Sequence, residues 1–138
     1  MAINNLTELS VVVPVYSRGQ CLLELHTKIY DAMRLNSVKF ELILVDDCAA
    51  GDSWEIINQL AAIYPHVKGI RMTRNFGQHN ATLCGMRHAL YENIATLDDD
   101  LQHPPEEIIA LANSFDADCD LVWGVPARQK HRTIRNVI

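Results

Sequence analysis

Three consecutive acids, Asp98, Asp99 and Asp100, are the residues of this sequence best suited to chemistry. They follow an apolar run at 93–97 that is typical of a strand, and Pro104 comes soon after them, before a helical pattern. Carboxylates this close together repel one another unless a cation neutralises them. Magnesium and manganese prefer such oxygen ligands and often share them with substrate phosphates. The pattern therefore predicts a metal-assisted site for a phosphate-bearing substrate.

We expect different roles within this run. Asp98 and Asp100 are the candidate ligands of Mg²⁺ or Mn²⁺, because an irregular turn after a strand can bring alternate residues onto one ion. Gln102 adds a neutral oxygen ligand, whereas Asp99 would project differently and contact a sugar or its ribose. A plainer alternative stays open, in which the acids only begin a loop or cap a helix.

A second group of polar residues follows other predicted strands. Asp46 and Asp47 end an apolar strand at 40–45, and Arg74 lies in a polar loop that opens a helix near Gly77. A helix N-terminus attracts anions, and glycine allows close approach of the backbone to a ligand. The loop around Arg74 is therefore a candidate contact for phosphate.

The hydrophobic pattern predicts the elements that position these residues. Apolar β-branched runs indicate strands, and segments with helical spacing lie between them. The predicted strands are 9–16, 40–45, 66–72, 93–97 and 120–125, and the predicted helices are 21–35, 52–64, 77–92 and 104–114. This alternation indicates an α/β fold, a Rossmann-like three-layer sandwich with a mostly parallel sheet. Right-handed crossovers would bring Tyr16, Asp47 and Asp98 to one edge of that sheet.

Composition limits the class of protein. The chain has 138 residues and 49% hydrophobic content, which suits one domain with a packed core. A net charge of -5 argues against a nucleic-acid binder. Four cysteines without C-x-x-C spacing suit the cytosol, and no apolar run is long enough to span a bilayer. Basic residues gathered at 128–135 could meet phosphate or an anionic membrane surface.

Four segments together resemble the family 2 inverting glycosyltransferases with the GT-A fold. The most similar subgroup transfers sugars to polyprenyl or dolichyl phosphate. The segments are 11–16, 42–48, 74–79 and 98–106. The resemblance covers about residues 9–128, and the four segments in this order are far more specific than any one of them.

This resemblance implies a nucleotide-diphosphate sugar, UDP- or GDP-linked, as the donor. It implies nucleoside contacts from four residues: Pro14, Tyr16, Val45 and Asp47. Asp98 and Asp100 resemble the catalytic D-x-D pair that holds the metal on the diphosphate, and Gln102 is similar to a further ligand of the lipid-phosphate subgroup. A divalent ion would neutralise the charge on the departing nucleoside diphosphate. The resemblance also implies a lipid-phosphate acceptor and a role in cell-envelope polysaccharide biosynthesis at the inner, cytoplasmic face of the membrane.

The sequence departs from the family pattern at a few positions. Ser17 and Arg18 stand where members often have Asn-Glu, and Pro126 stands where the subgroup often has Gly-x-Arg. We expect a single nucleotide-sugar-binding domain with its core at 9–125, followed at 126–138 by the start of an acceptor-side region. Such a chain should have little or no transferase activity alone, and uncovered apolar surface could drive formation of a homodimer.

Two alternatives belong to other classes of protein. A non-catalytic nucleotide-sugar-binding or scaffold module would keep the fold, with Arg18 and Pro126 as signs of lost chemistry. A receiver-like regulatory domain also pairs acids with Mg²⁺, but it needs an aspartate at the end of the third strand. This sequence has Thr73 and Arg74 there. Metal-dependent donor binding would separate an enzyme from the scaffold module.

Overall fold

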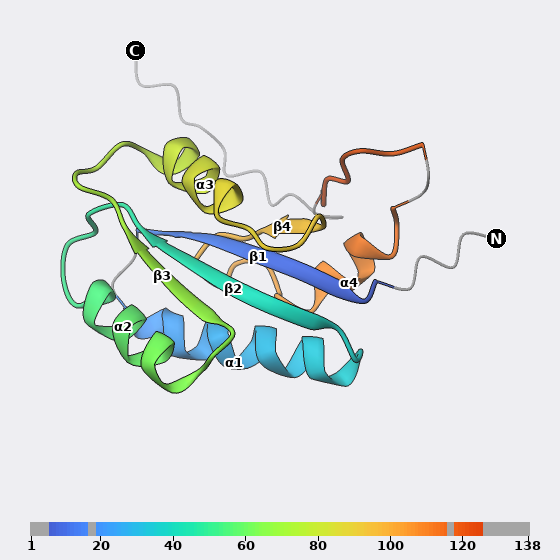
Figure 1. The fold of residues 1–138 in the computed structure, drawn as a ribbon, viewed down its shortest axis with the longest axis horizontal. Coiled ribbons are helices and arrows are strands. Elements are labelled where there is room, and N and C mark those ends of the chain that lie inside the picture. Colours follow the sequence, from blue (N-terminus) through green and yellow to red (C-terminus); the bar gives the residue numbers. More distant parts are fainter. Residues whose placement is uncertain (1–5, 17–18, 116–117, 126–138) are drawn as a thin grey trace, which may run out of the picture.

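A computed structural model describes residues 6–16, 19–115 and 118–125, whose strands form an all-parallel sheet (Figure 1). The strands are β1 Glu8–Val15, β2 Lys39–Asp46, β3 Val67–Arg71 and β4 Ile94–Thr96, in the order β3-β2-β1-β4. The helices are α1 Gln20–Leu35, α2 Ser53–Ile63, α3 Gln78–Arg87 and α4 Glu107–Ala112. The predicted α/β fold with a parallel sheet is confirmed.

Helices cover both faces of the sheet, which gives the predicted three layers (Figure 1). α1, α2 and α4 pack on one face over the larger core, and α3 lies on the other face. Successive side chains of a strand point to opposite faces, so Val11 and Val13 enter the larger core and Val12 meets α3. Within the described ranges, no helix is both long and apolar enough to cross a bilayer.

Gly85 lets α3 lie close to the sheet. A Cβ at this position would overlap with Val12 and would lie 3.1 Å from Cγ2 of Val45. Only glycine tolerates such an approach without displacing its neighbours. The close packing fixes the height of α3 above the strands, and with it the position of the helix start.

α3 ends at Arg87, so the prediction of a helix over 77–92 is wrong at its C-terminal end. Soon after α3, the backbone N–H of Leu90 donates to Oε1 of Glu41 at 2.5 Å. A longer helix would use that N–H internally. A carboxylate on β2 therefore competes with the helix for this N–H group, which helical spacing alone cannot reveal.

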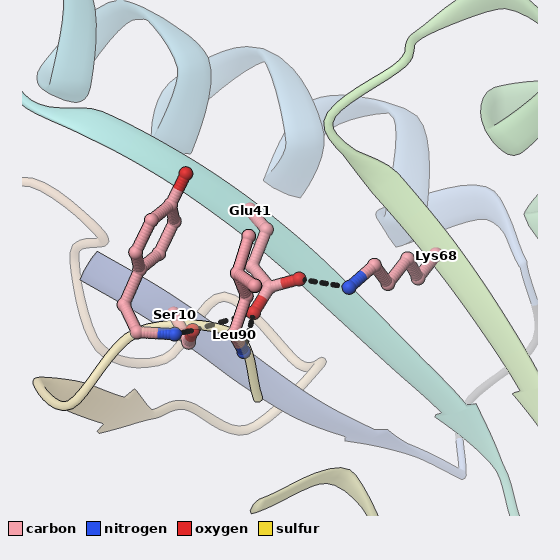
Figure 2. Close-up of polar contacts among 5 residues, drawn as sticks. Ser10, Glu41, Lys68 and Leu90 are labelled. Carbon is pink, nitrogen blue, oxygen red and sulfur yellow. Dashed lines mark hydrogen bonds and ion pairs between the residues drawn. The ribbon is translucent and has the colours of Figure 1, made fainter. Parts of the chain in front are cut away.

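Glu41 is the centre of a buried polar cluster (Figure 2). Its Oε1 also accepts a hydrogen bond from Oγ of Ser10, and its Oε2 pairs with Nζ of Lys68 at 2.5 Å. Burial alone would raise the pKa of Glu41, but the hydrogen bonds from Lys68, Ser10 and Leu90 and the Lys68 charge lower it overall. The cluster joins β1, β2 and β3 to the segment that precedes β4.

The predicted fifth strand at 120–125 is wrong, because the structure describes these residues without any strand. Leu121, Trp123 and Val125 are 73%, 79% and 74% exposed, as a paired and covered strand would not be. β4, at one edge of the sheet, offers only three residues for pairing, Ile94–Thr96. A ladder on so short an edge has few hydrogen bonds to hold it.

Candidate active site

The carboxyl ends of β1, β2 and β4 lie at one edge of the sheet, as their parallel order requires. Tyr16 follows β1, Asp47 follows β2, and the acids at 98–100 follow β4. An open depression of about 390 Å³ lies at this edge, lined by Tyr16, Gln78, Asp98, Asp99 and Asp100. Four of these residues were predicted site residues. Gln78 was not, although its place directly after Gly77 at a helix start is a signal that could have found it.

Asp99 is the buried member of the acid run. It is 4% exposed, and its Oδ2 accepts the backbone N–H of Tyr16 at 2.8 Å. Asp98 and Asp100 on either side are exposed, and Leu101 has a φ of 58°, a left-handed conformation that is unfavourable for leucine. Asp99 thus projects differently from its neighbours and ties the end of β1 to the segment after β4.

Asp47 holds the loop that leads into α3. Its side chain is fully buried, with Oδ1 accepting the N–H of Phe76 at 2.8 Å and Oδ2 accepting the N–H of Gly77 at 2.8 Å. Oδ2 also accepts the hydroxyl of Tyr16 at 3.3 Å. Gly77 has φ 91° and ψ 156°, a region of the backbone map that is essentially confined to glycine. One carboxylate therefore positions both an aromatic ring and a helix start.

Tyr16 presents a neutral phenol to the depression. Burial, followed by the charge of Asp47 and its hydrogen bond, raises the pKa of Tyr16 to about 12, and the charges of Asp99 and Asp98 add to the effect. The residue is 36% exposed, so part of its ring remains accessible to a ligand. An accessible ring whose hydroxyl and backbone N–H are both engaged is suited to packing against a flat group.

Asp98 and Asp100 both line the depression and are the predicted ligands of a divalent ion. In the described part of the chain, no three His, Cys, Asp or Glu side chains are grouped to hold a metal. Mg²⁺ is nevertheless commonly bound through one or two carboxylates together with water and substrate phosphates. Two exposed carboxylates beside an open depression fit an ion that arrives with a diphosphate. Gln102, the third predicted ligand, is exposed, and its backbone N–H donates to Oδ1 of Asp100 at 3.0 Å.

The other predicted contacts lie outside the depression. Pro14 and Val45 are register partners on β1 and β2, and both are buried. Arg74 is exposed, with its guanidinium carbon 4.6 Å from the centre of the Phe76 ring. Residues 17–18 and 126–138, which include Arg18, Pro126 and the basic stretch, are outside the described residues. The ligand contacts assigned to all these positions stay predictions.

The sequence profile described as Glycosyl transferase family 2 matches residues 10–136. The chain belongs to glycosyltransferase family 2. One similar protein is an undecaprenyl-phosphate 4-deoxy-4-formamido-L-arabinose transferase from Shewanella sediminis (strain HAW-EB3), 38% identical over 133 residues, which are 95% of this chain and 40% of that protein. A transferase of the same name from Enterobacter sp. (strain 638) is 39% identical over 120 residues, 86% of this chain and 36% of that one. The predicted similarity to polyprenyl-phosphate sugar transferases is confirmed, and the chain spans about 40% of the length of such relatives.

Solved glycosyltransferases share the fold of this family 2 chain. The mannosyltransferase PcManGT from Pyrobaculum calidifontis, in complex with GDP-Man and Mn²⁺, matches 76% of this chain and 30% of its own with a TM-score of 0.61 and 24% identity. TarS 1-349 from S. aureus, in complex with UDP, matches 68% of this chain and 28% of its own with a TM-score of 0.52 and 20% identity. At these identities the likeness establishes the fold, which is the predicted GT-A fold.

Proposed function

We propose that this chain is the donor-binding part of a metal-dependent, inverting glycosyltransferase that uses a UDP- or GDP-linked sugar. The observation that carries the proposal is the depression where Tyr16, Asp98 and Asp100 meet the start of α3. The names of the relatives point to undecaprenyl phosphate as the acceptor of the whole enzyme. The GDP-Man and Mn²⁺ of the mannosyltransferase complex support a nucleotide-sugar donor and a divalent ion.

The acids would act on the diphosphate through the ion. Asp98 and Asp100 would hold Mg²⁺ or Mn²⁺, with Gln102 as a further oxygen ligand. When bound, the ion neutralises the charge that develops on the departing nucleoside diphosphate. Arg74 and the start of α3 favour negative charge in the same region, because a helix N-terminus carries a partial positive charge.

The nucleoside would lie toward β1 and β2. Tyr16 offers an accessible ring, and the buried carboxylates of Asp47 and Asp99 hold its hydroxyl and its backbone N–H. Pro14 and Val45 pair in the strands that end at this point. In this arrangement Asp47 acts mainly by fixing Tyr16 and the α3 loop. Asp99 is almost completely buried and accepts the N–H of Tyr16, so only its small exposed part would contact the ribose or sugar.

The cellular location that we propose for the whole protein depends on its acceptor. With a lipid-phosphate acceptor, the location that we propose for the reaction is the inner, cytoplasmic face of the membrane, and the process that we propose is cell-envelope polysaccharide biosynthesis. Basic residues at 128–135 would contact the anionic surface there. Exposed apolar side chains, including Leu90 at 68% and Trp123 at 79%, are candidates for a homodimer contact.

Calorimetry on the 138-residue chain tests the proposal. UDP- and GDP-sugars are titrated with and without Mn²⁺, and the measurement is repeated on Asp100→Ala and on Asp31→Ala, an exposed acid of α1 that serves as the matched control. We expect donor binding that Mn²⁺ tightens, that in the presence of Mn²⁺ weakens by roughly tenfold or more in Asp100→Ala, and that is unchanged in Asp31→Ala. Donor binding that is the same with and without Mn²⁺, or no binding at all, would favour the scaffold module instead.

A further inference from the structure

Gln78 joins two parts of the site that are 20 residues apart in the sequence. It is the first residue of α3, and its side chain lines the depression. Its Nε2 donates to Oδ1 of Asp98 at 2.6 Å. An ionised carboxylate only accepts hydrogen bonds, so the amide must turn its NH₂ group toward Asp98.

The backbone of Gln78 is held firmly. Directly before it, the N–H of Gly77 donates to the buried carboxylate of Asp47 at 2.8 Å. Further along the same helix, Gly85 brings α3 against Val12. A side chain that starts from a fixed point has fewer conformations that reach Asp98, so its hydrogen bond restricts the direction of that carboxylate.

We propose that Gln78 is a positioning residue for the divalent ion. Its amide holds Oδ1 of Asp98 and leaves the other oxygen of that carboxylate for the ion. This inference rests on the proposed function, because it assumes that Asp98 is a metal ligand. Gln78 acts through Asp98, since an amide N–H group pointed at a carboxylate is a donor and does not ligate a cation. Partners that orient a metal ligand in this way typically contribute about 10- to 100-fold to metal affinity.

The hydrogen bond also has a role before the ion arrives. Asp98, Asp99 and Asp100 are consecutive, and like charges this close repel one another. The Gln78 amide offsets part of that repulsion at Asp98, and the backbone N–H of Gln102 does the same at Asp100. The two hydrogen bonds therefore restrict the orientation of both exposed carboxylates.

The test compares Gln78→Leu with Gln59→Leu, the same substitution at an exposed position of α2. Mn²⁺ affinity is measured by electron paramagnetic resonance in the presence of UDP or GDP, whichever the unmodified chain binds more tightly. The affinity for that nucleotide without metal is measured by calorimetry. We expect Gln78→Leu to weaken Mn²⁺ binding by about 10- to 100-fold, to leave metal-free nucleotide binding unchanged, and to melt like Gln59→Leu.

A double variant shows whether Gln78 acts through Asp98. In an Asp98→Ala background, adding Gln78→Leu should change Mn²⁺ affinity by less than about twofold, because the two residues act as one unit. Unchanged Mn²⁺ affinity in Gln78→Leu overturns the inference. An equal loss of metal-free nucleotide binding also overturns it, since Gln78 would then touch the nucleotide itself. If the unmodified chain shows no Mn²⁺-dependent nucleotide binding, the proposed function fails, and the inference fails with it.

Discussion

Several residues in this site are hydrogen-bonded to one another. Asp47 accepts three hydrogen bonds, from the N–H groups of Phe76 and Gly77 and from the hydroxyl of Tyr16. Asp99 accepts the N–H of Tyr16. The buried acids Asp47 and Asp99 thus hold the segments around the depression, whereas Asp98 and Asp100 are exposed beside it.

Replacement of the Asp47 carboxylate by an amide tests this division. Asp47→Asn keeps one acceptor oxygen, so it cannot accept the N–H groups of Phe76 and Gly77 on separate oxygens. We expect a loss of about 2–3 kcal/mol in the free energy of unfolding, because hydrogen bonds to a buried charge are strong and an unmade one is costly. Urea denaturation measures the loss, with Asp31→Asn as the exposed control.

The same substitution should change the titration of Tyr16. The Asp47 charge contributes to raising the pKa of Tyr16 to about 12, so Asp47→Asn should move that pKa toward the ordinary value of 10.0. Ultraviolet titration of tyrosinate follows this change, and subtraction of a Tyr16→Phe variant isolates the signal. An unchanged Tyr16 titration would show that burial and the charges of Asp99 and Asp98 set the pKa of Tyr16 without Asp47.

The sequence predicts which residues lie at this edge of the sheet, but it does not predict the directions of their side chains. Strand ends place Tyr16, Asp47 and Asp98 at one edge, and that rule depends only on parallel order. The inward turn of Asp99 depends on the loop backbone, including the left-handed Leu101, which no spacing rule anticipates. The role of Gln78 was missed for a related reason, since its partner Asp98 lies on a different element.

At the scale of elements, α3 is the part that sets the geometry of the depression. Gly77 and Gly85 lie toward the two ends of α3, and glycine is needed at each position for a different reason. Gly85 avoids overlap with Val12, whereas a Cβ at Gly77 would meet no atom within 4 Å and is excluded only by the backbone conformation. The two glycines therefore predict two kinds of mutational effect.

Gly85→Ala and Gly77→Ala should each cost about 1–3 kcal/mol of stability, the first by overpacking and the second by backbone strain. Val12→Ala distinguishes the causes, because it removes the Cγ atoms that a methyl group added at Gly85 would strike. The loss of unfolding free energy caused by Val12→Ala should be smaller by about 1 kcal/mol in the Gly85→Ala background than in the unmodified chain. In the Gly77→Ala background the loss caused by Val12→Ala should stay the same. Equal costs in both backgrounds, by urea denaturation, would contradict the packing explanation.

A pair of histidines makes another element contact pH-dependent. His26 on α1 and His66 before β3 have their Nε2 atoms 3.0 Å apart and their rings within 9° of parallel. Burial, and then the charge of His66, lowers the pKa of His26, and burial lowers that of His66. The aromatic rings of Tyr30, Phe40 and Tyr64 pack around the pair.

Lowered pKa values fix the sign of the pH effect. The unfolded chain takes up protons as pH falls through 6.5, and the folded chain does so only at lower pH. The contribution of the pair to stability is therefore complete above pH 6.5 and declines as pH falls below it. Urea midpoints on either side of pH 6.5 measure the decline, which should be smaller in His26→Gln and unchanged in His79→Gln, an exposed histidine.

Element boundaries were the least predictable part of the fold. The strands and the first two helices follow from hydrophobic periodicity. The end of α3 does not, because Glu41 on β2 accepts the N–H of Leu90 from a distance of 49 residues. The segment 120–125 has the composition of a strand, but composition cannot show that the edge strand β4 is only three residues long.

For the whole molecule, the question is whether donor binding and sugar transfer can be separated. The described residues gather Tyr16, the acids at 98–100 and the first residue of α3 around an open depression. Transfer also needs an acceptor held in line with the sugar, and such positioning accounts for a large share of enzymatic rate. The chain spans about 40% of the length of the relative from Shewanella sediminis, so donor binding and transfer are worth measuring separately in it.

We therefore expect this chain to bind a nucleotide sugar without transferring it. Radiolabelled UDP- and GDP-sugars are incubated with the chain, Mn²⁺ and undecaprenyl phosphate in detergent, and lipid-linked sugar is extracted. Product should not exceed that of the Asp98→Ala/Asp100→Ala double variant, while calorimetry still detects Mn²⁺-dependent donor binding by the unmodified chain. Metal-dependent transfer above that background would contradict the separation. It would place acceptor contacts among residues 1–138, and the exposed apolar surface near Trp123 would then be the first region to test by substitution.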